Sequence, residues 1–271
     1  MRILKTLRSH RPFFSTVDNS LNLTAPKGWK ELTQAQLRYV LRLLASFQDR
    51  TVVKTYMIVR FTGIHVLKKN RFGWQCFVRT TWWGKRKYFY LQTWQIESLL
   101  GQMKYVDSYE DMGVRLEDIH GLHAIDVQFH DMMFIDYLNA EKYYQLYMQT
   151  QKDEYLEKLA IYLYRKKNGE KPRKLKLDIA EMLGVYMWYS DMKLLFSRTF
   201  KHFFKKLDPD TDTDDAFDMR VAMDAQIRAL TDGDLTKEDM ILHTSVWRAL
   251  TELDAKAREA EELRKINKNG N

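Results

Sequence analysis

The chain has 271 residues, 45% hydrophobic and 30% charged, which excludes a disordered chain and suits one large domain or two ordinary ones. Its lone cysteine, Cys76, excludes an intramolecular disulfide and a zinc site built from cysteines. A single cysteine also favours a reducing cytoplasm as the location of the protein.

The charge divides into two halves of opposite sign. Residues 1–106 hold 19 Lys and Arg against 4 Asp and Glu, a net +15, whereas residues 107–271 have a net −7. The basic half suits nucleic acid or another anionic surface. A second interpretation is self-association, in which the basic half of one molecule docks on the acidic half of another. A third is that both halves are solvated and have no partner.

Two helices are predicted in the basic region. Thr33 and Gln36 have the spacing of a capping box, and a stripe of apolar residues follows them. Residues 52–61 fit a helix better than a strand, with Gly63 near its end.

A β-hairpin is predicted from Phe72 to Leu91, because apolar and polar residues alternate there around a Trp-Trp-Gly-Lys turn. The hairpin combines rings that stack on bases with cations that attract phosphates. Its candidate nucleic-acid contacts are Trp82, Trp83, Lys85, Arg86 and Lys87. The alternative is a solvated hairpin tip with its tryptophans packed below.

Three helices are predicted between Met132 and Lys205, in a trunk rich in Tyr, Met and Phe. Asp153 and Asp178 are the expected caps of the second and third helices. The uncharged run 182–190 is far shorter than the ~20 apolar residues of a membrane span, so we expect a buried helix and no membrane contact. The loop between the second and third helices is basic, and its Arg165, Lys166 and Lys167 are candidate contacts for a partner or nucleic acid. The alternative is a solvated loop.

Two acidic or histidine-containing segments invite a metal interpretation. His120 and His123, followed by Asp126 and His130, could share a metal, but they lack the helix context and the glutamate of HExxH. The run 208–215 lacks the Gly and Glu of a calcium loop, and we interpret it as a linker. We therefore expect no metal site.

The fold class predicted is mainly α, a multi-helix bundle with one small β-hairpin insertion. Its expected regions are a basic N-terminal region at 1–106, a helical trunk at 107–207 and a C-terminal helical tail at 208–271, whose last helix becomes charged and exposed after Asp254. No phosphate-binding, dinucleotide-binding or GxSxG motif occurs, so we expect a protein that is not an enzyme and needs no cofactor.

Three stretches resemble a known group of proteins: Pro26–Thr33, Phe134–Tyr143 with the helix that follows, and Arg228–Asp234 with Trp247–Ala257. Together they resemble uncharacterised proteins of tailed phages and prophages, and the helical second half resembles tail-assembly chaperones. The resemblance implies a phage protein that aids tail or virion assembly by binding structural subunits, in the cytoplasm of the bacterial host or in the virion. Nucleic-acid binding by the basic half is the alternative function.

Overall fold

The computed structural model describes residue 23 and residues 25–79, 84–204 and 219–269. The chain divides into two compact units, Met1–Ser108 and Tyr109–Asn271. The described part of the N-terminal unit contains these elements in order: a 3-10 turn Trp29–Glu31, α1 Gln34–Ser46, α2 Arg50–Thr62, β1 His65–Asn70, β2 Gly73–Arg79, β3 Arg86–Gln92, α3 Thr93–Gln102 and a 3-10 turn Lys104–Asp107.

Local sequence signals set the bounds of the first two helices. Thr33 and Gln36 form the predicted capping box at the start of α1. Asp49 caps α2 by accepting from the backbone N–H of Thr51, and Gly63 ends it in the left-handed conformation, with φ 68°. Both predicted helices are therefore confirmed.

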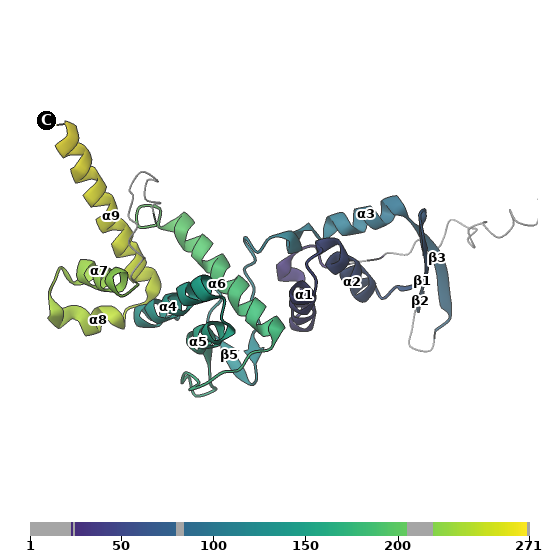
Figure 1. Ribbon diagram of the computed structural model, residues 1–271, viewed down its shortest axis with the longest axis horizontal. Coiled ribbons are helices and arrows are strands. Elements are labelled where there is room, and N and C mark those ends of the chain that lie inside the picture. Colours follow the sequence, from purple (N-terminus) through teal and green to yellow (C-terminus); the bar gives the residue numbers. More distant parts are fainter. Residues whose placement is uncertain (1–22, 24, 80–83, 205–218, 270–271) are drawn as a thin grey trace, which may run out of the picture. The chain divides into compact units, whose positions relative to one another are not determined.

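The predicted hairpin is confirmed as β2 and β3, but it belongs to a larger sheet. The three strands pair antiparallel in the order β1-β2-β3, with a bulge between Val66 and Lys68. One face of this sheet, called the inner face below, carries the buried Cys76, Val78 and Leu91. Strands β2 and β3 contact helix α3 (Figure 1). Alternation along each strand sends the next side chain to the opposite face, called the outer face below.

The C-terminal unit is helical with a second, very small sheet. Its described elements are β4 Asp118–Ile119, β5 Leu122–Ala124, α4 Phe134–Thr150, α5 Asp153–Leu163, β6 Tyr164–Arg165, α6 Ile179–Thr199, α7 Met219–Thr231, a 3-10 turn Leu235–Lys237, α8 Glu238–Leu242 and α9 Val246–Asn269. Strand β6 pairs with β5, so the chain leaving α5 joins the β4–β5 hairpin. The predicted fold class, mainly α, is therefore confirmed. The prediction of a single β-hairpin is not, because the described structure contains two three-stranded sheets.

The aromatic residues of the trunk form the core, as the periodicity predicts. Phe129 contacts Trp188 and Phe196 at ring-centroid distances of 5.4 and 6.2 Å. Trp188 is 1% exposed, and its indole N–H donates to the carbonyl of Val127 at 2.8 Å. None of the helices within the described ranges is long and apolar enough to cross a membrane.

The predicted caps of the trunk are right at one helix and wrong at another. Asp178 and Glu181 form a capping box at the start of α6. Helix α5, in contrast, starts at Asp153 itself, with Lys152 at the cap position. The carboxylate of Asp153 therefore sits in the first turn, where the helix dipole favours it.

The C-terminal helices α7, α8 and α9 pack together, and the second half of α9 extends beyond them (Figure 1). Leu250 and Leu253 at the start of α9 are buried, whereas Leu263 and Ile266 are 62% and 66% exposed. The predicted change to an exposed, charged helix after Asp254 is therefore confirmed. The predicted linker 208–215 lies outside the described residues.

Candidate nucleic-acid interface

The outer face of the β1–β3 sheet carries three cross-strand rows of side chains. Strand register pairs Arg79 with Arg86, places Phe77 between His65 and Tyr88, and places Gln75 between Lys68 and Tyr90. Most of these side chains are solvent-exposed, in contrast to those of the inner face. The outer face therefore includes a row of cations, a row of rings and a mixed polar row.

Two arginines face each other without a neutralising acid. Side chains directly opposite in an antiparallel pair have Cβ atoms ~5 Å apart, and like charges at that spacing destabilise the sheet. In the described part of the chain, no carboxylate forms an ion pair with Arg79 or Arg86. No Asp or Glu occurs anywhere between Arg50 and Ile96, whereas ten Lys and Arg do. This cation row is therefore suited to an external anion.

The ring row packs closely. His65 stacks on Phe77 with a centroid distance of 4.6 Å and an interplanar angle of 10°, and Tyr88 lies 5.8 Å from Phe77 on the other side. The guanidinium of Arg86 lies 5.1 Å from the Phe77 ring centroid, a cation–π contact that joins the cation row to the ring row.

A further aromatic side chain lies beside this face. Trp94, at the start of α3, is 63% exposed. Its indole N–H donates to Oε1 of Gln92 at 2.6 Å, and register places Gln92 on the outer face. Exposed tryptophan surface of this kind adds to the aromatic area that a ligand can contact.

The structure separates the hairpin residues that the sequence grouped together. Trp82 and Trp83 lie outside the described residues. Lys85 precedes β3 and is exposed, and Arg86 is on the outer face. Lys87 pairs with Val78 and so lies on the inner face. Strand alternation thus directs Arg86 and Lys87 to opposite sides of the sheet.

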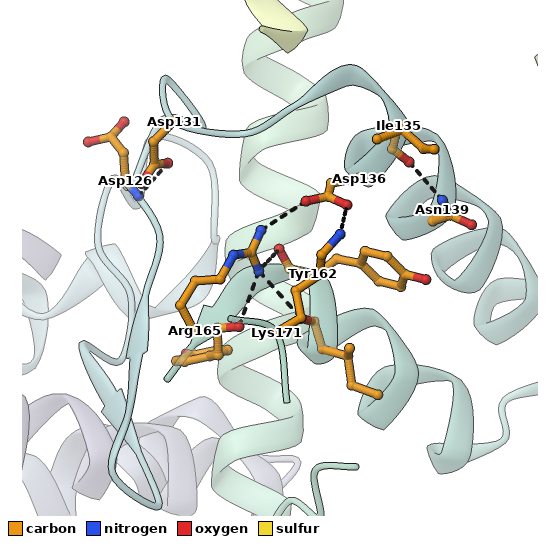
Figure 2. A network of polar contacts seen from close by, with 10 residues as sticks. Asp126, Asp131, Ile135, Asp136, Asn139, Tyr162, Arg165 and Lys171 are labelled. Carbon is orange, nitrogen blue, oxygen red and sulfur yellow. Dashed lines mark hydrogen bonds and ion pairs between the residues drawn. The ribbon is translucent and has the colours of Figure 1, made fainter. Parts of the chain in front are cut away.

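The second predicted cluster has one member, Arg165, that is only 18% exposed and is engaged within the protein. Arg165 Nη2 donates to Oδ2 of Asp136 at 3.0 Å, and Arg165 Nη1 donates to the carbonyl of Tyr162 at 3.0 Å (Figure 2). Lys171 reaches the other carboxylate oxygen of Asp136 (Figure 2). The Asp136 side chain is only 5% exposed. Arg165 therefore holds α4 to the end of α5 and β6, a structural arrangement.

The two lysines beside it point to solvent. Lys166 pairs with Glu170 at 3.1 Å across a tight turn at Gly169, where φ is 83°. Lys167 is exposed. Of the three predicted residues, Lys166 and Lys167 are exposed, whereas Arg165 is part-buried.

Burial raises the pKa values of Cys76 and Asp191. Burial raises the pKa of the Cys76 thiol to about 11, which Lys69 partly opposes. Burial also raises the pKa of Asp191, whose carboxylate accepts from the backbone N–H of Gly113 at 2.9 Å. Neither group faces a second titratable side chain at hydrogen-bond distance in the described structure.

The histidines considered as metal ligands are dispersed among acidic partners. His120 Nε2 lies 3.0 Å from Glu181, and His130 Nδ1 lies 2.8 Å from Asp126. His130 also stacks on Trp247, with a centroid distance of 5.3 Å. Within the described ranges, no three His, Cys, Asp or Glu side chains gather in a way that could hold a metal ion.

Sequence reasoning missed His65, Lys68, Tyr88 and Tyr90 as members of the surface that carries Phe77 and Arg79. The signal available was the alternation of ring or cation with apolar residue along 73–92, combined with the absence of acid from 50–96. Strand β1 has no such alternation because of its bulge, so its pairing with β2 needed the structure.

Comparisons with known proteins give no relative. No protein-family model matches the chain, and no match is found among curated proteins or among solved structures.

Proposed function

We propose that this protein binds nucleic acid through the outer face of its N-terminal sheet. The observation that carries the proposal is the opposed pair Arg79 and Arg86 beside a row of rings, within a stretch that has no acidic residue. Two cations held this close without a carboxylate cost stability in the free protein, and a bound phosphate removes that cost.

Charge on the whole unit supports the same conclusion. Met1–Ser108 holds 19 Lys and Arg against 5 Asp and Glu, a net +14, whereas Tyr109–Asn271 holds 25 against 31, a net −6. A basic surface releases counterions from nucleic acid on binding, so affinity falls steeply with salt. The aromatic rings supply what a purely electrostatic surface lacks, because every base has a face that stacks.

The test is fluorescence anisotropy of a labelled oligonucleotide titrated with the full chain at several salt concentrations. Replacing Arg79 and Arg86 by Ala should weaken binding and flatten the slope of log affinity against log salt by ~0.7 per lost phosphate contact on a single strand. The matched control replaces Lys27 and Lys30, two exposed cations of the same unit outside the sheet. Equal losses for both double variants, or no binding by the wild type, would contradict the proposal.

Assembly of phage tails or virions by protein binding is the second candidate. Its support is the resemblance of the three sequence stretches and a group of exposed apolar side chains on the C-terminal helices, of which Val221, Leu235 and Met240 are 63%, 80% and 63% exposed. Exposed apolar groups of this kind occur at protein-binding surfaces.

This second function predicts binding to purified tail-tube or tape-measure protein that a Leu235→Ser, Met240→Ser variant loses. If the opposite charges of the two units orient the partner, binding also weakens with salt. Lack of binding to both partners at every salt concentration would eliminate it.

A further inference from the structure

We infer that the ligand of the outer face is single-stranded nucleic acid, whose bases stack on His65 and Tyr88. This inference rests on the proposed function and specifies its ligand. It follows from which rings of the ring row are accessible, from the shape of the sheet and from the cations beside the rings.

Phe77 packs between His65 and Tyr88 in the ring row and offers little surface to a ligand. It is 8% exposed, because His65, Tyr88 and the guanidinium of Arg86 surround it. Tyr88 is 38% exposed, and His65 is exposed as well. The two outer rings are therefore available to bases, and Phe77 fixes their orientation from the middle strand.

The shape of the sheet favours an open strand. Bases of a duplex are stacked inside it, and only their edges are accessible in the grooves. A groove ~12 Å wide admits a helix or a two-stranded ribbon, whereas three strands place their outer axes ~10 Å apart before side chains are added. A single strand laid across the sheet, in contrast, can turn its bases onto the rings.

Cations lie on both sides of the rings. Arg79 and Arg86 lie two residues along the strands in one direction, and Lys68 lies in the mixed row on the other side. Two residues of a strand span ~6.8 Å, so phosphates on either side of a stacked base come within reach of these long side chains. Tyr90, in the mixed row, is held by its hydroxyl, which donates to Asn70 Oδ1 at 2.8 Å.

The experiment compares three labelled probes of equal length with the full chain: an oligothymidylate, the same backbone with abasic sites, and a duplex. Wild-type protein should bind the oligothymidylate most tightly, with a gain over the abasic strand of roughly fivefold to a hundredfold, the range of one stacked base. Tyr88→Ala should lose most of that gain, whereas Tyr88→Phe, which keeps the ring, should retain it.

The outcomes separate this inference from the proposed function. Equal affinity for the base-containing and abasic strands, or tighter binding of the duplex, would overturn the stacking inference and leave phosphate binding intact. Binding of none of the probes would remove both. Because the wild-type comparison needs no variant, it decides even if Tyr88→Ala fails to fold, and His65→Ala provides a second variant that should reduce the same gain.

Discussion

Arg165 and Asp136 form an ion pair of 3.0 Å in which the carboxylate is almost fully buried. The guanidinium also donates to backbone carbonyls at the end of α5, so one side chain joins α4, α5 and β6 (Figure 2). Burial lowers the pKa of Arg165, and the negative charge of Asp136 opposes part of that shift. The contribution of this ion pair to stability can therefore be tested by removing one of its partners.

We predict that Asp136→Ala destabilises the C-terminal unit by ~3 kcal/mol, because removing one partner of a buried pair leaves the other charge uncompensated. The free energy of unfolding in urea, followed by circular dichroism, measures this. Glu170→Ala is the control, since it breaks the exposed pair with Lys166 and should change little. Similar small changes in both variants would show that the Asp136 network is not stabilising.

Gly73 is predicted to be indispensable to the first sheet. Its φ is +147°, and a Cβ there would lie 2.0 Å from the carbonyl oxygen of Leu91. Gly73→Ala should therefore cost ~2 kcal/mol or more, because backbone strain and steric overlap add. Gly28→Ala is the control, since nothing lies within 4 Å of its Cβ position. Equal unfolding midpoints for the two variants would contradict the close approach of β2 and β3.

Cys76 is predicted to be unreactive in the folded protein. Its side chain is 0% exposed, and burial raises its pKa to about 11, so the nucleophilic thiolate is scarce at pH 8. A disulfide reagent should modify it at least ~100-fold more slowly than in denaturant. Moving the thiol one residue, with Gln75→Cys and Cys76→Ser together, places it on the outer face, where modification should be rapid. Slow modification of that variant would contradict the assignment of the two faces.

Asp191 should make stability depend on pH. Burial raises its folded pKa, so the folded protein retains the proton to a higher pH than the unfolded chain does. Stability is therefore lost as pH rises from the unfolded pKa of ~3.9 through the folded value, and the loss is constant above it.

Asp191→Asn keeps an oxygen that accepts from Gly113 but cannot ionise. Relative to wild type, this variant should gain stability as the pH rises above the unfolded pKa of ~3.9, as measured by thermal unfolding at each pH. Asp224→Asn, at an exposed position within α7, is the control and should show no such trend. A pH-independent difference for Asp191→Asn would show that its carboxyl ionises normally.

Much of the helical framework could be predicted from local sequence. Two helices begin at capping boxes, at Thr33 and Asp178, and α2 ends at a glycine in the left-handed conformation. These features depend only on atoms that are close together along the chain. The aromatic core of the trunk could likewise be predicted, because apolar residues repeated at helical spacing must be buried together.

The candidate site could be predicted only in part. Alternation along the hairpin indicated that Phe77 and Arg79 share a face. Arg86 and Lys87, in contrast, were grouped because they are adjacent in sequence, although adjacent side chains of a strand point to opposite faces of the sheet. Arg165 was grouped with Lys166 and Lys167 by charge, and nothing local shows that Asp136, 29 residues away, accepts from it.

Local sequence thus indicated the trunk helices, the caps at Thr33 and Asp178, the hairpin and the opposite charges of the two halves, since each depends on atoms a few residues apart or on a sum over residues. Which charges are neutralised and which are exposed depends on contacts between distant segments. His65 reaches Phe77, and Arg165 reaches Asp136, through strand pairing and helix packing between distant segments. Such contacts depend on the whole fold, and they determine which basic residues can meet an anion.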